Sequence, residues 1–228
     1  MTTAVIMQPT YIPWMGYFNL ISQADHFVFL DDVKIEKQSW HVRNKVLNQG
    51  EEHLITLPIL GSRNQALNQV ALDENQNWRE KHSKLITHLY RKHEHGLDML
   101  NTILPLINDK KIITLVNLNT SIIMSIAKKL EFKPVFHFSS NLNITAPRTQ
   151  RLVSICHQLE CNNYLSPMGS KEYIEQDGDF APSAIDVVFQ NFSPQPYPQK
   201  NVTPFVPYLS IIDMVANIGW ADAARKTQ

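Results

Sequence analysis

The first 32 residues of the chain alternate between apolar runs and polar breaks. Apolar residues dominate 2–7 and again 26–31, and each run has the length of a buried strand. Between them, apolar residues of 17–21 have helical spacing and predict a short helix that ends within 19–25. Strand, irregular aromatic loop, helix and strand form the unit of open α/β sheets, which bind ligands at the carboxyl ends of their strands.

The same pattern predicts further elements along the rest of the chain. Strands are predicted at 52–60, 70–72, 135–138, 164–166 and 185–190, and helices from 77, at 97–107, at 112–130, at 148–159, from 171 and at 209–219. Gly219 is expected to end the last helix, and the proline-rich tail 191–209 to be irregular. The alternation predicts one α/β domain, 1–228, with a mostly parallel, open, Rossmann-like sheet. The helices of 78–130 are expected to form an added layer or sub-lobe.

Charge and composition exclude several functional classes. Lys and Arg together number 21, as do Asp and Glu, so the formal net charge is zero and no broad basic surface for nucleic acid or anionic membrane is indicated. No window approaches the roughly 18–20 apolar residues of a membrane span, and the first residues lack the charged start of a signal peptide. With two cysteines, Cys156 and Cys161, we expect a cytoplasmic protein with reduced thiols and no membrane insertion.

The loop after the first predicted strand combines aromatic rings with hydrogen-bonding groups. Its members are Gln8, Tyr11, Trp14 and Tyr17. Flat apolar faces with polar tips suit a sugar or a nucleotide base, which stacks on rings and requires directional partners. The alternative is a surface loop held by its own aromatic side chains. We favour ligand binding.

Two further features are candidates for acid–base chemistry. Asp31 and Asp32 directly follow the second predicted strand, where one of them could bind a ligand hydroxyl, amine or metal. The alternative is an acid pair that only ends a strand and begins a turn. His82 lies four residues after Trp78 on the same helix face and is a candidate general base, although a lone His there is more often a core or surface residue.

Arginine side chains provide candidate binders of phosphate or carboxylate. Arg43 lies in a polar cluster with Trp40 and Asn44, soon after the acid pair. Arg148 stands at a predicted helix start, where anions are favoured. For each arginine the alternative is simple solvation.

Two other groupings are not expected to carry chemistry. His88, His93 and His95 have a spacing similar to that of zinc ligands but lack acidic or Cys partners, so we predict no metal site there. Cys156 lies on an apolar helix stripe and is expected to be a small buried hydrophobe, not half of a thiol pair with Cys161. The common nucleotide-binding, hydrolase and metalloprotease fingerprints are absent from the sequence.

Several short stretches resemble the signature of the WbqC-like family. The most extended is QPTYIPWMGYF at 8–18. The other matching positions are Ala24-Asp25, Phe27-Val28, Asp31-Asp32, Ser39-Trp40, Arg43-Asn44, Trp78, Lys81-His82, Arg151-Leu152, Tyr164-Leu165-Ser166, Gly169, Lys171, Tyr173, Tyr197-Pro198-Gln199, Phe205, Leu209-Ser210-Ile211 and Asp213. The matches extend over nearly the whole chain. Two departures, Pro167 and Cys161-Asn162, affect the loop around 164–171.

The resemblance implies a bacterial protein that works on nucleotide-linked or lipid-linked sugars in the synthesis of O-antigen, lipopolysaccharide or other surface polysaccharides. Our leading hypothesis is a transferase that forms an amide, by acyl or aminoacyl transfer, on the amino group of a nucleotide-linked amino sugar. Asp31 or Asp32 would orient the amine, and His82 or Asp32 would accept its proton. Arg43 or Arg148 would bind phosphate.

The resemblance and the residue chemistry together define the expected binding site. Its members are Gln8, Tyr11, Trp14, Tyr17, Trp40, Arg43, Asn44, Arg148, Ser166, Gly169, Lys171, Tyr197 and Gln199. No cofactor or metal is assigned. The expected partners are a nucleotide-linked sugar and a donor that is an acyl carrier or an aminoacyl-tRNA, and a homodimer is one assembly left open.

Two alternative functions remain. The first strand, Pro9 and the run 14–17 are faintly similar to the HxGH loop of adenylate-forming nucleotidyltransferases, which would make the protein an ATP-dependent ligase with nucleotidyltransferase-like topology. Trp14 and Tyr17 stand at the two His positions, however, and neither supplies a cation for a triphosphate. The other alternative is a non-catalytic protein that binds a sugar nucleotide within a polysaccharide assembly.

Overall fold

The centre of the protein is a five-stranded sheet in which every pair of neighbouring strands is parallel. The computed structural model describes residues 1–36, 39–61 and 64–228. Across the sheet the strands are β7 (Val135–Phe138), β2 (His26–Phe29), β1 (Thr3–Met7), β8 (Asn163–Ser166) and β9 (Asp186–Phe189). In chain order this is 3-2-1-4-5, the order used by doubly wound sheets, and it reverses between β1 and β8.

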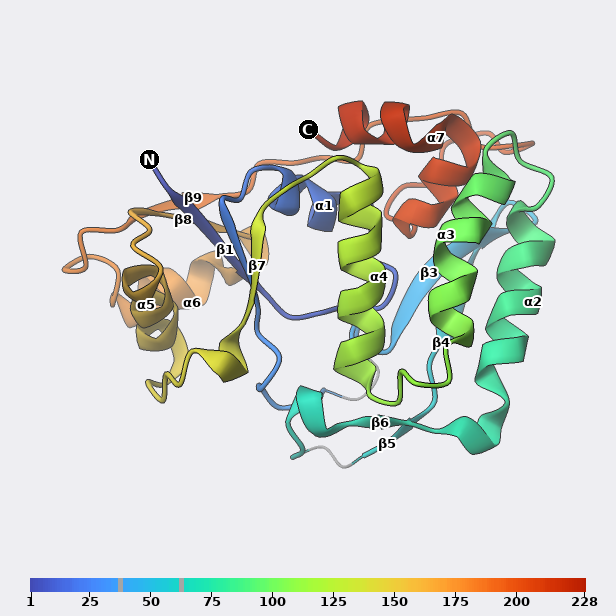
Figure 1. Ribbon diagram of the computed structural model, residues 1–228. Helices are drawn as coiled ribbons and strands as arrows, with labels where there is room; N and C mark the ends of the chain where they lie inside the picture. The colour runs from blue at the N-terminus through green and yellow to red at the C-terminus, as the bar shows by residue number, and fades with distance from the viewer. Residues whose placement is uncertain (37–38, 62–63) are drawn as a thin grey trace.

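Helices cover both faces of this sheet (Figure 1). On one face lie α1 (Met15–Ser22) and α4 (Leu115–Lys129), and on the other lie α5 (Arg148–Gln158) and α6 (Lys171–Asp177). Successive residues of a strand point to opposite faces, so each strand contributes to two cores. Val5, Phe27 and Phe29 belong to the core with α1 and α4, whereas Ala4, Ile6 and Val28 belong to the core with α5 and α6. These findings confirm the α/β class and the mostly parallel open sheet.

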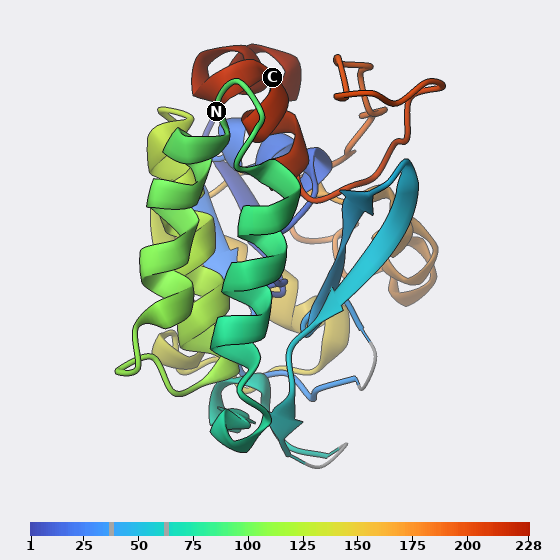
Figure 2. The same ribbon diagram turned by 90° about the vertical axis from the view of Figure 1, so that its right-hand side faces the viewer.

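Three more helices belong to the fold (Figures 1 and 2). They are α2 (Trp78–Tyr90), α3 (Gly96–Asn108) and α7 (Ile211–Thr227). Two of them, α2 and α3, lie beyond α4, and the third, α7 at the C-terminus, lies against α1 and α3. The helices predicted within 78–130 are therefore present, and their apolar residues belong to the same core cluster as β1, β2, α1 and α4. No helix among the described residues is long and apolar enough to cross a membrane.

Small antiparallel pairs complete the fold. The hairpin of β3 (Arg43–Asn48) and β4 (Glu51–Thr56) lies beside α2 in Figure 2, and β5 (Ile59–Leu60) pairs with β6 (Ala71–Leu72). Short 3₁₀ helices lie at Leu67–Gln69, Glu74–Gln76, Ser139–Asn141 and Met168–Ser170.

The prediction of one buried strand at 52–60 is wrong. Within β4 only Ile55 is buried, and the chain leaves the strand before Pro58, which has no N–H to continue a ladder. The preceding turn has positive φ at Gln49 and Gly50 (53° and 85°), as two-residue hairpin turns require. Apolar content alone cannot separate such an exposed hairpin from a buried strand.

Gly219 ends a helical segment, as predicted, but a second segment that was not predicted follows it within α7. Gly219 has φ 78° and ψ 171°, which kinks α7, but the helix resumes and continues to Thr227. A Cβ at this position would lie 3.0 Å from Nδ1 of His95, and the backbone N–H of His95 donates to the Ala216 carbonyl oxygen at 3.0 Å. Gly219 therefore permits the close approach of the start of α3 to α7.

Candidate functional site

Two adjoining cavities open at the carboxyl ends of β1 and β8, where the strand order reverses. The first, here called the switch-point cleft, has a volume of about 390 Å³. Its lining includes Met7, Gln8, Thr10, Glu36, Ser39, Trp40, His41, Gly169, Ser170 and Tyr173. Ligands of open α/β sheets bind at this kind of topological position.

The second cavity, here called the aromatic cavity, has a volume of about 440 Å³. It is lined by Met7, Thr10, Trp14, Tyr17, Trp40, Asn44, Lys45 and Tyr208. Met7, Thr10 and Trp40 line both cavities. The two cavities therefore share a wall, and one elongated ligand or two reactants could meet across it.

The loop between β1 and α1 is strained and firmly held. Ile12 has φ 37°, a left-handed conformation that is rare for a β-branched residue. The buried side chain of Asn44 donates to the carbonyl oxygens of both Tyr11 and Ile12, each at 3.0 Å. The N–H of Tyr11 donates to the Trp40 carbonyl oxygen at 3.0 Å. Asn44 is thus placed where it holds the loop and lines the aromatic cavity.

His41 is a cleft residue that the sequence reasoning did not select. Its Nε2 lies 2.7 Å from Oε1 of Gln8. Because a carbonyl oxygen can only accept, Nε2 carries the proton and Nδ1 holds the lone pair. Nδ1 has no hydrogen-bond partner among the described residues, and burial lowers the pKa of His41 to about 4. The imidazole is consequently neutral at pH 7.

The position of His41 is set by a buried amide on α4. Nδ2 of Asn119, which is completely buried, donates to the carbonyl oxygens of His41 at 2.8 Å and Pro9 at 3.2 Å. Asn119 thereby joins the backbones on either side of the cleft. The only sequence signal for His41 was its place directly after Ser39-Trp40, and neither distant partner, Gln8 or Asn119, is visible in a local pattern.

Aromatic side chains form most of the second cavity. The ring of Trp14 lies 5.3 Å from that of Tyr208 and 5.9 Å from that of Phe192, centroid to centroid. Trp40 is 49% exposed although it lines both cavities. The hydroxyl of Tyr17 donates to the carbonyl oxygen of Gln8 at 3.1 Å. Exposed indole at a cavity mouth is available for stacking on a planar ligand.

The loop after β8 forms the opposite wall of the switch-point cleft. Ser166 is completely buried; its Oγ donates to the Tyr164 hydroxyl at 3.2 Å and contacts Oγ of Ser170, which lines the cleft. A Cβ added to Gly169 would meet nothing within 4 Å. Lys171 lies outside the cleft lining, where its Nζ is 3.7 Å from Glu175.

The acid pair lies outside both cavities and is fully engaged in hydrogen bonds. Asp31, which is buried, accepts from the Ser139 hydroxyl at 3.1 Å and from the N–H and hydroxyl of Ser140 at 3.0 and 2.7 Å. Asp32 pairs with Arg151 at 2.6 Å and accepts from Ser139 at 2.5 Å. Burial raises the pKa of Asp32, but hydrogen bonds from Arg151 and Ser139 and the Arg151 charge outweigh it and lower the pKa below its usual value. The pair connects β2 to the start of the β7–α5 loop and to α5.

His82 also lies outside the cavities. Its Nε2 is 3.1 Å from the Thr56 carbonyl oxygen, and its Nδ1 is 3.0 Å from the hydroxyl of the buried Tyr11. The carbonyl can only accept, so Nε2–H donates to it and the tyrosine donates to Nδ1. Burial lowers the pKa of His82 to about 4. Both ring nitrogens are occupied, and the residue joins α2, the aromatic loop and the segment after β4.

The remaining predicted site residues lie apart from the two cavities. Arg43 stacks over Trp40 at 5.9 Å without lining either cavity. Arg148 is mostly exposed and lies 3.4 Å from Asp177. Tyr197 and Gln199 are buried, and both donate to Oδ2 of Asp213, at 2.7 and 3.3 Å. The structure therefore brings together Gln8, Trp14, Tyr17, Trp40, Asn44 and Gly169, with Ser166 beneath them.

Fold and site together define an α/β protein with a ligand cleft at a topological switch point. Residues 8–225 match the model of the WbqC-like protein family, so the chain belongs to that family. It is also similar to the uncharacterized protein Rv1507c of Mycobacterium tuberculosis, with 25% identity over 221 residues that cover 96% of this chain and 95% of the mycobacterial one. No solved structure matches the chain.

Proposed function

We propose that the protein is a transferase of O-antigen or other surface polysaccharide synthesis that forms an amide on the amino group of a nucleotide-linked amino sugar. The observation that carries the proposal is the wall shared by the two cavities at the reversal between β1 and β8. A nucleotide sugar has a planar base, charged phosphates and a hydroxyl-rich ring. One cavity is lined mainly by aromatic rings and a lysine, and the other contains more hydrogen-bonding side chains.

The aromatic cavity suits the nucleotide half of the ligand. Trp14, Trp40 and Tyr208 offer ring faces for a base. Lys45 is the only Lys or Arg side chain among the lining residues, where it also pairs with Glu52 at 2.6 Å. Its ammonium group would bind a phosphate in place of part of that exposed ion pair, which is itself of little energetic worth.

The switch-point cleft suits the amino sugar. Gln8, Thr10 and Ser39 supply hydrogen-bonding groups for the hydroxyls of the ring. Glu36 is exposed at this cleft and would orient the amino group of the sugar by accepting a hydrogen bond from it. These assignments replace the sequence-based roles of Asp31 and Asp32, whose oxygens are already bonded within the protein.

His41 is the candidate general base. The sugar amine attacks the acyl carbon of the donor, an N–C bond forms, and the bond to the leaving thiol or hydroxyl group breaks. The excess proton on nitrogen passes to a base, and Nδ1 of His41 is neutral at pH 7 and without a partner among the described residues. Because Nδ1 is buried, a movement of the cleft wall on ligand binding would have to expose it.

The proposal is tested by incubating the protein with a nucleotide-linked amino sugar and candidate acyl or aminoacyl donors, with products read by mass spectrometry. A mass gain equal to the acyl group is expected. His41→Gln should lower the rate by about 10²-fold or more, whereas Arg148→Ala, on the exposed side of α5, is the matched control and should retain activity. Unchanged activity in His41→Gln and Trp40→Ala would contradict the placement of the site.

Thermal shifts separate this function from the alternatives. Stabilisation by the nucleotide sugar, lost in Trp40→Ala, supports the transferase, because a ligand that binds only the folded state raises its stability. Stabilisation by ATP with magnesium but not by the nucleotide sugar would instead favour an adenylate-forming ligase. Binding of the sugar nucleotide without turnover of any donor would favour a non-catalytic carrier.

A further inference from the structure

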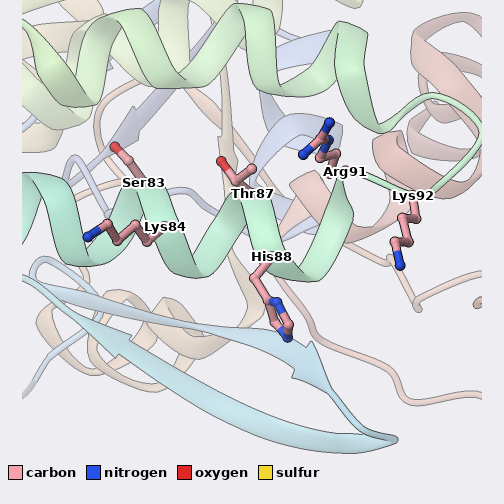
Figure 3. A pocket seen from close by; sticks show the side chains of 6 residues that line it. All are labelled: Ser83, Lys84, Thr87, His88, Arg91 and Lys92. Atoms are coloured by element: carbon pink, nitrogen blue, oxygen red, sulfur yellow. The ribbon is translucent and has the colours of Figure 1, made fainter.

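A third cavity, far from β1 in the chain, contains a buried acid beneath two lysines. This α2-end cavity has a volume of about 430 Å³ and lies between the last turn of α2, the tip of the β3–β4 hairpin and residues 200–202. Its lining includes His88, Lys92, His93, Lys200 and Asp213. Figure 3, which draws a neighbouring pocket, shows His88 projecting from α2 toward the β3–β4 hairpin, Lys92 just beyond the end of α2, and Ser83 and Thr87 on the other side of the helix.

Asp213 has an unusual hydrogen-bond arrangement for a completely buried carboxyl. Tyr197 and Gln199 donate to Oδ2, at 2.7 and 3.3 Å, whereas Oδ1 has no hydrogen-bond partner among the described residues. Burial raises the pKa of Asp213, and hydrogen bonds from Tyr197, Gln199 and Tyr90 only partly offset this effect. Buried polar atoms are nearly always partnered, and a free acceptor requires a donor from elsewhere.

The rim of the cavity has the opposite charge. Among the described residues that line it, Lys92 and Lys200 are the only Lys or Arg side chains, and Asp213 is the only acid. The Lys200 ammonium group donates to the Lys92 carbonyl oxygen, which holds the two residues side by side. The nearby His93 has its pKa lowered by burial and then by Lys200. The cavity therefore has a buried carboxyl at its floor and a positively charged rim.

We propose that the α2-end cavity binds a small zwitterion, whose ammonium group donates to Oδ1 of Asp213 and whose anionic group lies between Lys92 and Lys200. A metal ion is a poorer occupant, since no three His, Cys, Asp or Glu side chains of the described chain are gathered so as to hold one. A simple anion is also poorer, because it would leave Oδ1 unpartnered. This inference does not rest on the proposed transferase activity.

Binding requires a small movement of the cavity wall. Asp213 has no exposed surface, so the ligand reaches Oδ1 when residues 200–202 move aside. Three hydrogen bonds hold this segment. One is the bond from the Lys200 ammonium group to the Lys92 carbonyl oxygen. In the other two, the N–H of Lys200 donates to Oδ1 of Asn217 at 3.1 Å, and the N–H of Val202 donates to the Gln199 carbonyl oxygen at 3.2 Å. A ligand that bridges floor and rim would fix the segment and slow the exchange of its amide hydrogens.

The test uses matched ligands on the full chain. Glycine, β-alanine, 4-aminobutyrate and phosphoethanolamine carry both charges at increasing separation or with a different anion, whereas butyrate and butylamine each lack one charge. By calorimetry, the best zwitterion should bind about tenfold or more tightly than either single-charge control. It should also slow amide exchange in 200–202. Equal binding of butyrate and 4-aminobutyrate, or no binding of any zwitterion at millimolar concentration, would overturn the proposal.

Variants locate the binding. Lys92→Ala and Asp213→Asn should each weaken the binding of the zwitterion by about tenfold. Lys84→Ala is the matched control; this lysine lies earlier on α2 and outside the cavity, so its removal should leave the affinity unchanged. If Asp213→Asn fails to fold, Lys92→Ala together with the ligand series decides the question. A nucleotide sugar should not compete with the zwitterion, which distinguishes failure here from failure of the transferase proposal.

Discussion

The carboxyl ends of β2, β1 and β8 lie at the same edge of the sheet. The polar side chains that follow β2 are all hydrogen-bonded within the protein, whereas, in the part of the chain that the structure describes, some of those at the ends of β1 and β8 are not. After β2, the Asp31 and Asp32 carboxylates accept from Ser139, Ser140 and Arg151. After β1, the cleft contains an exposed indole and an imidazole nitrogen without a partner among the described residues. A saturated polar network stabilises a fold, whereas one with unused capacity can bind a ligand.

The largest effect should come from breaking the saturated side. Asp31→Ala leaves the N–H and the hydroxyl of Ser140 without their acceptor in a buried site, whereas the Ser139 hydroxyl still has Asp32, so the free energy of unfolding should fall by roughly 3–5 kcal/mol. Urea denaturation at pH 7 measures it. Asp31→Asn keeps one acceptor oxygen and should cost less, and a loss below about 1 kcal/mol in the alanine variant would refute a structural role.

The pH dependence of stability should reveal the two buried histidines. The pKa values of His41 and His82 are lowered to about 4 in the folded protein, against about 6.5 in the unfolded chain. Between these values the unfolded chain binds more protons, so stability is full above pH 6.5 and falls as the pH drops toward 4, by up to roughly 3 kcal/mol for each histidine.

Denaturation curves collected from pH 7 to 4 measure this slope. His82→Gln should flatten it without affecting nucleotide-sugar binding at pH 7. Saturating nucleotide sugar should alter only the contribution of His41 to the pH dependence of stability. His82 should be unaffected, because both of its ring nitrogens are already hydrogen-bonded, whereas Nδ1 of His41 has no partner among the described residues. A stability that does not change over this range would show that both histidines protonate in the folded state.

An intermediate effect is expected on the unsaturated side. Trp40→Ala removes a ring that lines both cavities and is 49% exposed. We expect it to weaken nucleotide-sugar binding by about tenfold, or 1–2 kcal/mol, and to change the free energy of unfolding by less than about 1 kcal/mol. Calorimetry and urea denaturation on one preparation give both numbers. A large loss of stability with intact affinity would reverse the assignment.

The smallest effect is expected at Arg148. Its side chain is 70% exposed and pairs only loosely with Asp177. Arg148→Ala should change stability by less than about 0.5 kcal/mol, and ligand affinity should not change. A clear loss of nucleotide-sugar affinity in this variant would restore Arg148 as a phosphate ligand.

The sequence was sufficient for most of the sheet. The strands at 135–138, 164–166 and 185–190 were predicted within one residue or so, because short apolar runs between helices have few alternatives. The exposed hairpin of β3 and β4 was not predicted, because its strands have no regular alternation of buried and exposed residues along the sequence. Hydrophobic periodicity reflects the burial of one face of an element, and only one residue of β4 is buried.

The candidate site was predictable only in part. The aromatic loop was conspicuous, and Trp14 and Tyr17 do line a cavity. His41 was missed because its neighbours, Gln8 and Asn119, are 33 and 78 residues away in the chain. The charged residues that drew attention, Asp32 above all, had partners more than 100 positions away that satisfied them. Local sequence shows which groups are polar, but not which ones remain unpaired.

The pairing of β1 with β8 has a consequence for the order of events during synthesis. Thr3 pairs with Asn163, 160 residues later in the chain. At about 5–20 residues per second, a ribosome takes roughly 8–32 s to make that stretch. Throughout this interval one edge of the central strand has no neighbour, and unpaired edges are templates for aggregation. No ligand of the cleft can protect the growing chain during this interval, because the loop after β8, which forms one wall of the cleft, has not yet been translated. The free edge of β1 is therefore where a chaperone would be needed most.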